Sequence, residues 1–187
     1  MQALKLAFLG MGVMGAPMAG HLLTKGGYQV TVYNRTRAKA EAWVAAHGGT
    51  VANSPAAAAE GVKAVISCVG TDDDLASITL GRDGAFRTMA KGTLYIDHTT
   101  VSAKIARQLS VEADSRGLMV VDAPVTGGQA GAENGTLTLM CGGKKPAKKA
   151  AKAVVKKAPA KKAAKKMAPV KAVKKMPAKK KSAAKKK

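Results

Sequence analysis

The chain of 187 residues has few aromatic residues, two cysteines and no long apolar run. Phe, Trp and Tyr together make up 3% of it. Cys68 and Cys141 lie far apart, so we expect two reduced thiols and no disulfide framework. No stretch reaches the roughly 18 consecutive apolar residues that a membrane-spanning helix needs. The first residues lack the pattern of a secretory signal, so we expect a cytoplasmic protein that does not enter a membrane.

Acidic residues are missing from the last quarter of the chain. Residues 144–187 carry 20 Lys and no Asp or Glu, whereas residues 1–143 carry 12 Lys and Arg against 11 acids. The formal net charge of +21 therefore belongs almost entirely to the last 44 residues. A segment dominated by Lys, Ala and Pro, with no aromatic residue and no glycine, cannot bury a core. We expect residues 1–143 to form one domain and residues 144–187 to form a disordered tail.

The lysine-rich tail supports a separate hypothesis about partners. Its lysines can displace condensed counterions from a duplex, so an alternative function is nonspecific, salt-dependent binding of DNA or RNA, with association with the nucleoid. The tail has no arginine to read base edges and no aromatic residue to stack on bases, so we expect no sequence specificity. It resembles the tails of linker histones and bacterial histone-like proteins. A solvated tail without a partner, or a product of gene fusion or frameshift, are the other interpretations.

Strand-like and helical segments alternate through residues 1–143. Apolar and β-branched runs predict strands at residues 4–9, 29–33, 50–51, 64–69, 93–97, 119–125 and 136–141. Apolar periodicity and capping residues predict helices at residues 14–25, 36–46, 72–80, 85–89 and 102–116, and one that starts at Ser54-Pro55. This alternation predicts an α/β fold of the Rossmann type, a doubly wound and mostly parallel sheet with helices on both faces.

Three glycines, Gly10, Gly12 and Gly15, follow the first predicted strand and open a helix. In the dinucleotide-binding fingerprint the first glycine permits a tight turn and the second lets the backbone approach the pyrophosphate. The third lets the helix pack close to the strand. The free N–H groups of the helix N-terminus would then face the phosphates. We therefore predict a dinucleotide site on this turn.

The second predicted strand ends at Asn34-Arg35-Thr36. An NAD site usually carries an acidic residue there for the ribose 2′-hydroxyl, and a carboxylate would repel a 2′-phosphate. Arg35 can pair with a 2′-phosphate and stack on adenine, while Asn34 and Thr36 can add neutral hydrogen bonds. The sequence thus favours NADP(H), with NAD(H) as the second possibility. The alternative for Arg35 is an ordinary surface residue.

Several stretches, in order, resemble the β-hydroxyacid dehydrogenases: residues 10–19, 68–74, 97–101, 122–128 and 132–138. That family includes 3-hydroxyisobutyrate dehydrogenase and tartronate semialdehyde reductase and is related to 6-phosphogluconate dehydrogenase. The resemblance covers residues 4–143. It implies an oxidoreductase that transfers hydride between NADP and a small hydroxy acid, such as 3-hydroxyisobutyrate or a 2-hydroxy-3-oxopropionate-type substrate.

The resemblance also implies roles for individual residues. Cofactor contacts would come from the glycine-rich turn and from two later loops: Met11, Val13, Met14, Val69, Gly70, Asp74 and Thr100. Thr126, Gly127 and Gly128 would hold the substrate carboxylate through a hydroxyl and backbone N–H groups. A strand end followed by two glycines exposes backbone donors, which also suits an anion on physical grounds.

The chain departs from the family after Gly142-Gly143. The family's general acid/base is a lysine in a Gly-x-x-x-Lys-x-x-Asn segment that leads into an all-helical second domain. No tail lysine has that spacing, so we assign no catalytic residue. Acid–base catalysis needs a group held within hydrogen-bond reach of the proton. We expect this chain alone to be incomplete for catalysis, and an uncovered apolar face to favour self-association.

The histidines predict no metal site. His21, His47 and His98 are widely spaced, and no cluster of cysteines or acids accompanies them at ligand spacing. The acidic run at residues 72–74 fits the start of a helix, where carboxylates complement the helix dipole. His98 lies in a loop on the cofactor side and is a candidate for a ligand contact.

Overall fold

A seven-stranded sheet in the order β3-β2-β1-β4-β5-β6-β9 dominates the computed structural model of the chain, which describes residues 3–143. All neighbours in the sheet are parallel except β6 and β9. The strands of this sheet are β1 (Lys5–Leu9), β2 (Gln29–Tyr33), β3 (Thr50–Val51), β4 (Ala64–Ser67), β5 (Leu94–Asp97), β6 (Met119–Asp122) and β9 (Gly142–Gly143). The order 3-2-1-4-5-6 is that of the Rossmann fold, so the predicted fold class is confirmed. The predictions for residues 144–187 lie outside the described residues.

Six α-helices and one 3-10 helix connect the described strands. They are α1 (Gly15–Thr24), α2 (Arg37–His47), α3 (Pro55–Ala59), α4 (Asp72–Leu80), the 3-10 helix η1 (Ala85–Arg87), α5 (Ala103–Ser115) and α6 (Gly128–Asn134). The hydroxyls of Ser54, Thr71 and Ser102 accept a backbone N–H at the starts of α3, α4 and α5. Hydroxyl caps of this kind satisfy N–H groups that a helix leaves without partners. The predicted short helix at residues 85–89 forms as the 3-10 helix η1 and ends two residues earlier than predicted.

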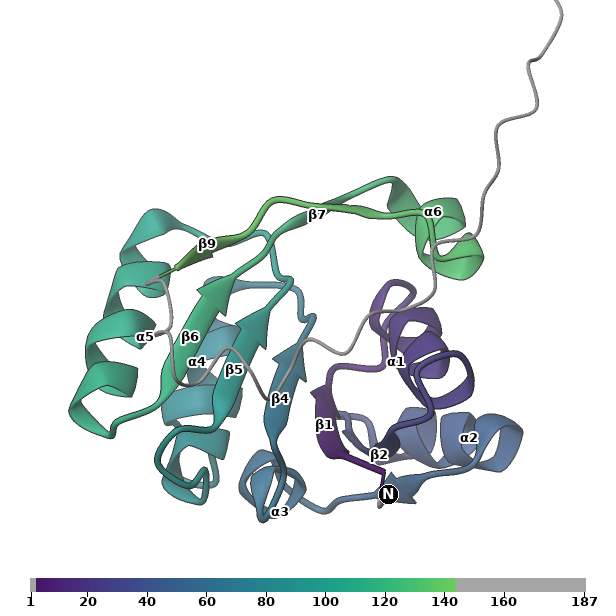
Figure 1. Cartoon of the computed structure of the whole chain (residues 1–187), viewed down its shortest axis with the longest axis horizontal. Helices are drawn as coiled ribbons and strands as arrows, with labels where there is room; N and C mark the ends of the chain where they lie inside the picture. Colours follow the sequence, from purple (N-terminus) through teal and green to yellow (C-terminus); the bar gives the residue numbers. More distant parts are fainter. Residues whose placement is uncertain (1–2, 144–187) are drawn as a thin grey trace, which may run out of the picture.

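The helices cover both faces of the sheet (Figure 1). Alternate residues of β1 point to opposite faces. Ala7 and Leu9 pack with side chains from α3, α4, η1 and α5. Leu6 and Phe8 pack instead with side chains from α1 and α2, among them the buried Trp43. The central strand is therefore buried on both sides, as its continuous apolar run predicts.

The segment after β6 differs from the prediction of two long strands at residues 119–125 and 136–141. β6 ends at Asp122, and β7 (Val125–Thr126) pairs with β8 (Thr138–Leu139) in a separate two-stranded sheet. Pro124 lies between β6 and β7 and has no N–H to donate to a ladder, which explains the interruption. The chain then returns to the main sheet, where Gly142-Gly143 pairs antiparallel with β6.

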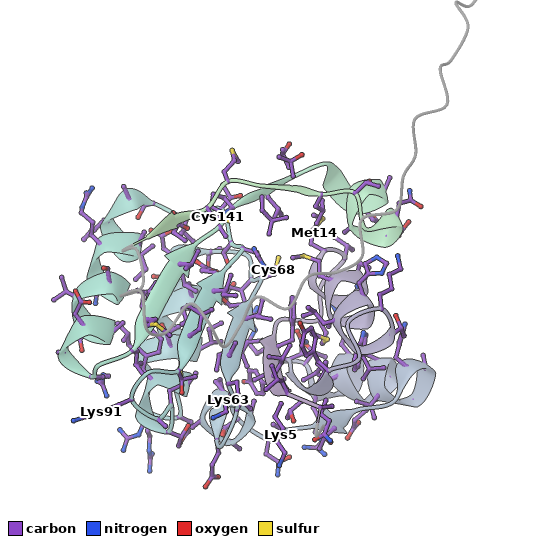
Figure 2. The ribbon with its side chains drawn as sticks, viewed as in Figure 1. Lys5, Met14, Lys63, Cys68, Lys91 and Cys141 are labelled. Carbon is purple, nitrogen blue, oxygen red and sulfur yellow. The ribbon has the colours of Figure 1, made fainter. Side chains whose placement is uncertain are left out.

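The two ends of the sheet differ in their side chains (Figure 2). Met14 and Cys68 lie at the carboxyl ends of the strands, whereas Lys5, Lys63 and Lys91 lie at the opposite end. The strand order reverses between β1 and β4, and ligands of such sheets bind at the carboxyl ends beside that point. Within residues 3–143 no helix has the length and hydropathy to cross a membrane.

Gly15→Ala should destabilise the fold, because an added Cβ would lie 2.0 Å from the Gly10 carbonyl oxygen and 3.0 Å from Phe8 Cε1. Overpacking of this kind costs about 1–3 kcal/mol of unfolding free energy. Gly12→Ala is the matched control, since its Cβ would meet no atom within 4 Å. Urea denaturation of both variants checks the prediction. Equal unfolding free energies for the two would contradict it.

Candidate nucleotide-binding site

The glycine-rich turn lies between the ends of β2 and β4. Gly10 has a φ of +106°, and a Cβ there would lie 2.2 Å from the Cys68 carbonyl oxygen. The Gly10 N–H donates to the Tyr33 carbonyl at 2.9 Å, and the Cys68 N–H donates to the Leu9 carbonyl at 3.0 Å. Glycine is required at position 10 for both its φ and its close contact. The turn therefore lies at the point where the strand order reverses.

Helix α1 begins at this turn with neither a side-chain cap nor an acidic residue in its first turn. Met14 occupies the N-cap position and makes no capping hydrogen bond through its side chain, and the first turn carries no acid. Helix α4, which starts near the same edge of the sheet, has the Thr71 cap and three aspartates in its first turn. The positive end of α1 is thus left for an anion, and phosphate groups bind at such helix ends.

Asn34 connects the turn to the loop after β2. Its Oδ1 accepts the Met11 N–H at 2.9 Å, and its Nδ2 donates to the Thr36 carbonyl at 3.0 Å. The Met11 side chain is 4% exposed and packs in the core below the turn. These hydrogen bonds give Asn34 a structural role that its position in the sequence did not reveal. A backbone N–H of the turn and a side chain 23 residues away in sequence come together only in the fold.

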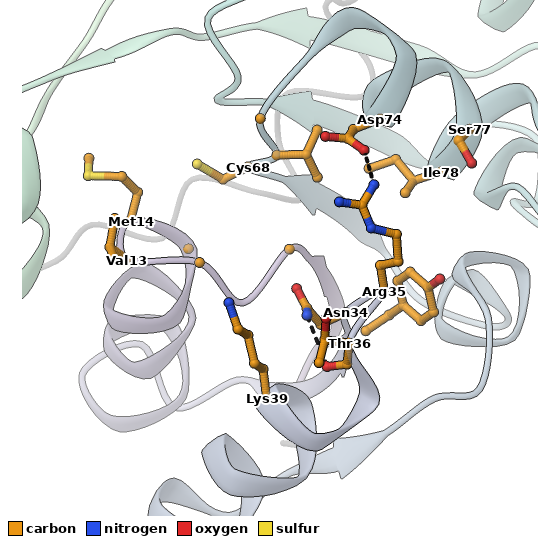
Figure 3. A pocket seen from close by; sticks show the side chains of 16 residues that line it. Val13, Met14, Asn34, Arg35, Thr36, Lys39, Cys68, Asp74, Ser77 and Ile78 are labelled. Atoms are coloured by element: carbon orange, nitrogen blue, oxygen red, sulfur yellow. Dashed lines mark hydrogen bonds and ion pairs between the residues drawn. The ribbon is translucent and has the colours of Figure 1, made fainter.

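A pocket of about 410 Å³ opens beside the turn (Figure 3). Its lining includes eleven residues that the sequence analysis assigned to the cofactor: Gly10, Gly12, Val13, Met14, Gly15, Asn34, Arg35, Thr36, Val69, Gly70 and Asp74. Met11 and Thr100 do not line it, since Met11 is buried and Thr100 lies exposed in the loop after β5. The fold therefore gathers residues from four separate stretches into one cavity.

Sequence reasoning missed five residues that line the pocket: Tyr33, Lys39, Cys68, Ser77 and Ile78. Of these, Lys39 matters most, because it adds a second cation to the lining of the pocket. It extends from α2 toward the glycine-rich turn (Figure 3). Lys39 lies in the first turn of the helix that follows Arg35, and a basic residue so close to the end of β2 is the signal that could have revealed it.

Arg35 reaches from the loop after β2 across the pocket toward α4. Its guanidinium forms an ion pair with the carboxylate of Asp74 in the first turn of α4 (Figure 3). The Arg35 side chain is 83% exposed and that of Asp74 is 25% exposed. The loop after β2 and the first turn of α4 therefore meet through an ion pair that solvent reaches.

A buried hydrogen-bond network lies behind the pocket, at the ends of β4 and β5. The Tyr95 hydroxyl donates to Ser67 Oγ at 2.7 Å, and the Ser67 hydroxyl donates to Asp97 Oδ1 at 2.7 Å. The Thr99 N–H donates to the same Asp97 oxygen at 3.0 Å. Thr99 Oγ1 in turn accepts the Val69 N–H at 3.1 Å. The network thus joins the loop after β4, which lines the pocket, to the loop after β5, which carries Thr100.

Burial raises the pKa of ionisable groups in this network and beside it. Burial raises the pKa of the Asp97 carboxyl, against the opposing effect of hydrogen bonds from Thr99 and Ser67. Burial, and secondarily the Asp97 carboxylate, raises the pKa of the Cys68 thiol to about 11. Burial likewise raises the pKa of Tyr95. Cys68 therefore remains a thiol near neutral pH and is not a nucleophile, because only the thiolate reacts.

The predicted substrate residues lie outside this pocket, at the junction of β7 and α6. Thr126 is exposed, and Gly127 and Gly128 have φ angles of +128° and +61°. His21 of α1 donates from Nε2 to the carbonyls of Ala132 and Glu133 at 2.9 and 3.0 Å. The last turn of α6 is therefore hydrogen-bonded to the helix that starts at the glycine-rich turn.

Two further predictions concern histidine and acidic residues. His98 is buried and donates from Nδ1 to the Ala123 carbonyl at 2.8 Å, so it joins the ends of β5 and β6 and does not line the pocket. Asp72, in the acidic run that starts α4, accepts the N–H and hydroxyl of Ser102, and these hydrogen bonds lower its pKa. Residues 3–143 contain no group of three or more His, Cys, Asp or Glu that could hold a metal ion.

Comparison with protein families identifies this arrangement. Residues 5–168 match the family described as the NAD binding domain of 6-phosphogluconate dehydrogenase. The chain belongs to this family. The resemblance predicted from the sequence is confirmed, and the pocket beside Gly10, Gly12 and Gly15 lies where this NAD-binding domain is expected to hold its dinucleotide.

Relatives of this NAD-binding family share the first three quarters of the chain. An uncharacterized oxidoreductase from Shewanella frigidimarina is 53% identical over 74% of this chain and 47% of its own length. The NAD-dependent L-serine dehydrogenase of Pseudomonas aeruginosa is 41% identical over 74% of this chain and 46% of its own length. The chain therefore spans about half the length of these relatives.

A solved structure shows the same fold in this family. The 3-hydroxyisobutyrate dehydrogenase of Mycobacterium tuberculosis, determined with L-serine, matches with a TM-score of 0.70 and 32% identity. The match covers 81% of this chain and 49% of that one. This structural match therefore agrees with the family match, since both indicate an NAD-binding domain like that of 3-hydroxyisobutyrate dehydrogenases.

Asp97→Asn should change how stability depends on pH. The unfolded carboxyl ionises near 3.8, whereas the folded one keeps its proton to a higher pH. The contribution of Asp97 to the free energy of unfolding is therefore fully present below pH 3.8. It is lost as the pH rises through the raised pKa of the folded protein. Relative to wild type, Asp97→Asn should gain unfolding free energy as the pH increases through this window.

Urea denaturation of wild type and Asp97→Asn at a series of pH values measures this effect. The control is Asp83→Asn, which removes the same charge from an exposed residue and should follow the wild-type curve. Parallel stability curves for wild type and Asp97→Asn would show that burial of Asp97 does not couple its protonation to folding.

Proposed function

We propose that the chain binds NADP(H) in preference to NAD(H) and forms the nucleotide-binding part of a dehydrogenase that acts on small hydroxy acids. The observation that carries this proposal is that two cations, Arg35 and Lys39, line the pocket beside the glycine-rich turn. The residues directly after β2 include no carboxylate, which is the group that usually binds the 2′-hydroxyl of NAD.

The two ends of the pocket suit different parts of a dinucleotide. The uncapped start of α1 and the open space at Gly12 suit the pyrophosphate, because backbone N–H groups can approach it there. Arg35 can pair with a 2′-phosphate in a bidentate manner, and Lys39 adds a point charge. Thr36 offers a hydroxyl at the same end. When bound, the nicotinamide would accept or donate the hydride.

A hydroxy acid with a carboxylate is the substrate class we propose. Thr126, Gly127 and Gly128 supply a hydroxyl and backbone N–H groups at the start of α6, and Thr100 lies in the loop after β5. Such donors suit a small carboxylate. The names of two relatives carry L-serine or 3-hydroxyisobutyrate, which are both small hydroxy acids with a carboxylate.

Arg35→Ala should weaken NADPH binding by about tenfold or more, because a charge-assisted pair with the 2′-phosphate is lost. NADH, which has a neutral hydroxyl there, should bind nearly as before. Arg37→Ala is the matched control: Arg37 pairs with Glu41 and Asn53, does not line the pocket, and carries the same charge.

Calorimetric titration of the full chain with NADPH and NADH measures these affinities. The absence of saturable NADPH binding by wild type would reject the proposed function. Equal losses of NADPH and NADH affinity in Arg35→Ala would reject the 2′-phosphate role alone.

Turnover by the chain as printed is expected at background level. Its sequence contains no Gly-x-x-x-Lys-x-x-Asn segment, in which the resemblance places the general acid/base. Without a group positioned to move the proton, a bound cofactor and substrate react slowly. An assay of NADP(H) absorbance with 3-hydroxyisobutyrate and tartronate semialdehyde checks this, and robust turnover would contradict it.

A further inference from the structure

We propose that Asp74 is a specificity-determining residue that weakens the binding of NADP(H) relative to NAD(H). Its carboxylate holds the Arg35 guanidinium across one end of the pocket, where a 2′-phosphate would need the same guanidinium. The inference rests on the proposed function, because it assigns a role to Asp74 within the same dinucleotide pocket.

The Asp74 carboxylate is the more firmly held partner of the pair. Asp74 is the third residue of α4, and its N–H donates to the Thr71 hydroxyl at 3.1 Å. A Cβ on Gly70 would lie 3.3 Å from Asp74 Oδ2, so glycine at position 70 leaves room for the carboxylate. The start of α4 also favours a negative charge through the helix dipole. Arg35 is far more exposed, so it is the partner that must move.

The neighbouring acids of α4 do not share this role. Asp72 accepts two hydrogen bonds from Ser102 at the start of α5. Asp73 is exposed, and neither of these residues lines the pocket. Within the acidic run, Asp74 alone faces the dinucleotide pocket and pairs with Arg35.

Asp74 weakens the binding of a 2′-phosphate in two ways. The phosphate must compete with the carboxylate for Arg35, and the two anions then repel each other across the guanidinium. The neutral 2′-hydroxyl of NAD(H) needs no arginine and meets no repulsion. Lys39 forms no ion pair among residues 3–143, so its attraction for a phosphate is not reduced in the same way. Asp74 therefore reduces the preference for NADP(H) over NAD(H) that Arg35 and Lys39 create.

Asp74→Asn in the full chain tests the inference. The amide keeps the shape of the side chain and removes its charge. The affinity for NADPH should rise about two- to fivefold relative to that for NADH, which is the range that a solvent-exposed ion pair contributes. The gain should shrink when salt is raised from about 0.05 M to about 0.5 M, because exposed charges are screened.

Two further variants make the test specific. Asp73→Asn removes the same charge from the same helix turn at a position outside the pocket, and it should leave the ratio of NADPH to NADH affinity as in wild type. In an Arg35→Ala background, Asp74→Asn should give a smaller gain for NADPH, since the competition for Arg35 is gone.

The outcomes separate this inference from the proposed function. Saturable NADPH binding by wild type combined with an unchanged or lower NADPH affinity in Asp74→Asn overturns the role of Asp74 and leaves the proposed function standing. An equal gain for NADPH and NADH, or the same gain in Asp73→Asn, also overturns it. Wild type that binds no NADPH overturns both.

Discussion

The close approach of Gly15 to the Gly10 carbonyl is the constraint on which the rest of the site depends. The missing Cβ of Gly15 allows α1 to start directly above the end of β1. This position directs the uncapped N-terminus of α1 into the pocket and presses Gly10 against the end of β4. A side chain at either glycine would push the helix away from the strand, and the phosphate site would lose its backbone donors.

Two regions of the site, one buried behind the pocket and one at its solvent-exposed side, are held by different interactions. Behind the pocket, Tyr95, Ser67, Asp97 and Thr99 form a buried network, and among residues 3–143 no buried side-chain N or O atom lacks a hydrogen-bond partner. Satisfied polar groups in a low dielectric hold loops in one arrangement. At the exposed side, the pair of Arg35 and Asp74 is open to solvent, where charges attract each other weakly and can exchange partners. The buried network suits precise placement of the loops, and the exposed ion pair suits selection between cofactors.

Much of the fold was predictable because its signals are local. Alternating apolar strands and capped helices predicted the parallel sheet, and the glycine spacing predicted the turn. Residues 119–125 are divided into β6 and β7 because Pro124 has no N–H to donate to a strand ladder. The roles of Asn34 and Lys39 were not predictable in the same way. Asn34 binds the Met11 N–H, and Lys39 lines a pocket formed largely by other segments.

The sequence by itself determined the class of fold, the dinucleotide turn and the candidate cation Arg35 after β2. It could do so because glycine conformation, strand periodicity and the sign of a charge are properties of residues and their near neighbours. The tertiary structure alone decided that Asp74 pairs with Arg35, that Asn34 braces the turn and that Asp97 is buried beneath the loops. Each of these contacts joins segments more than 20 residues apart, so it exists only once the strands have taken their order in the sheet.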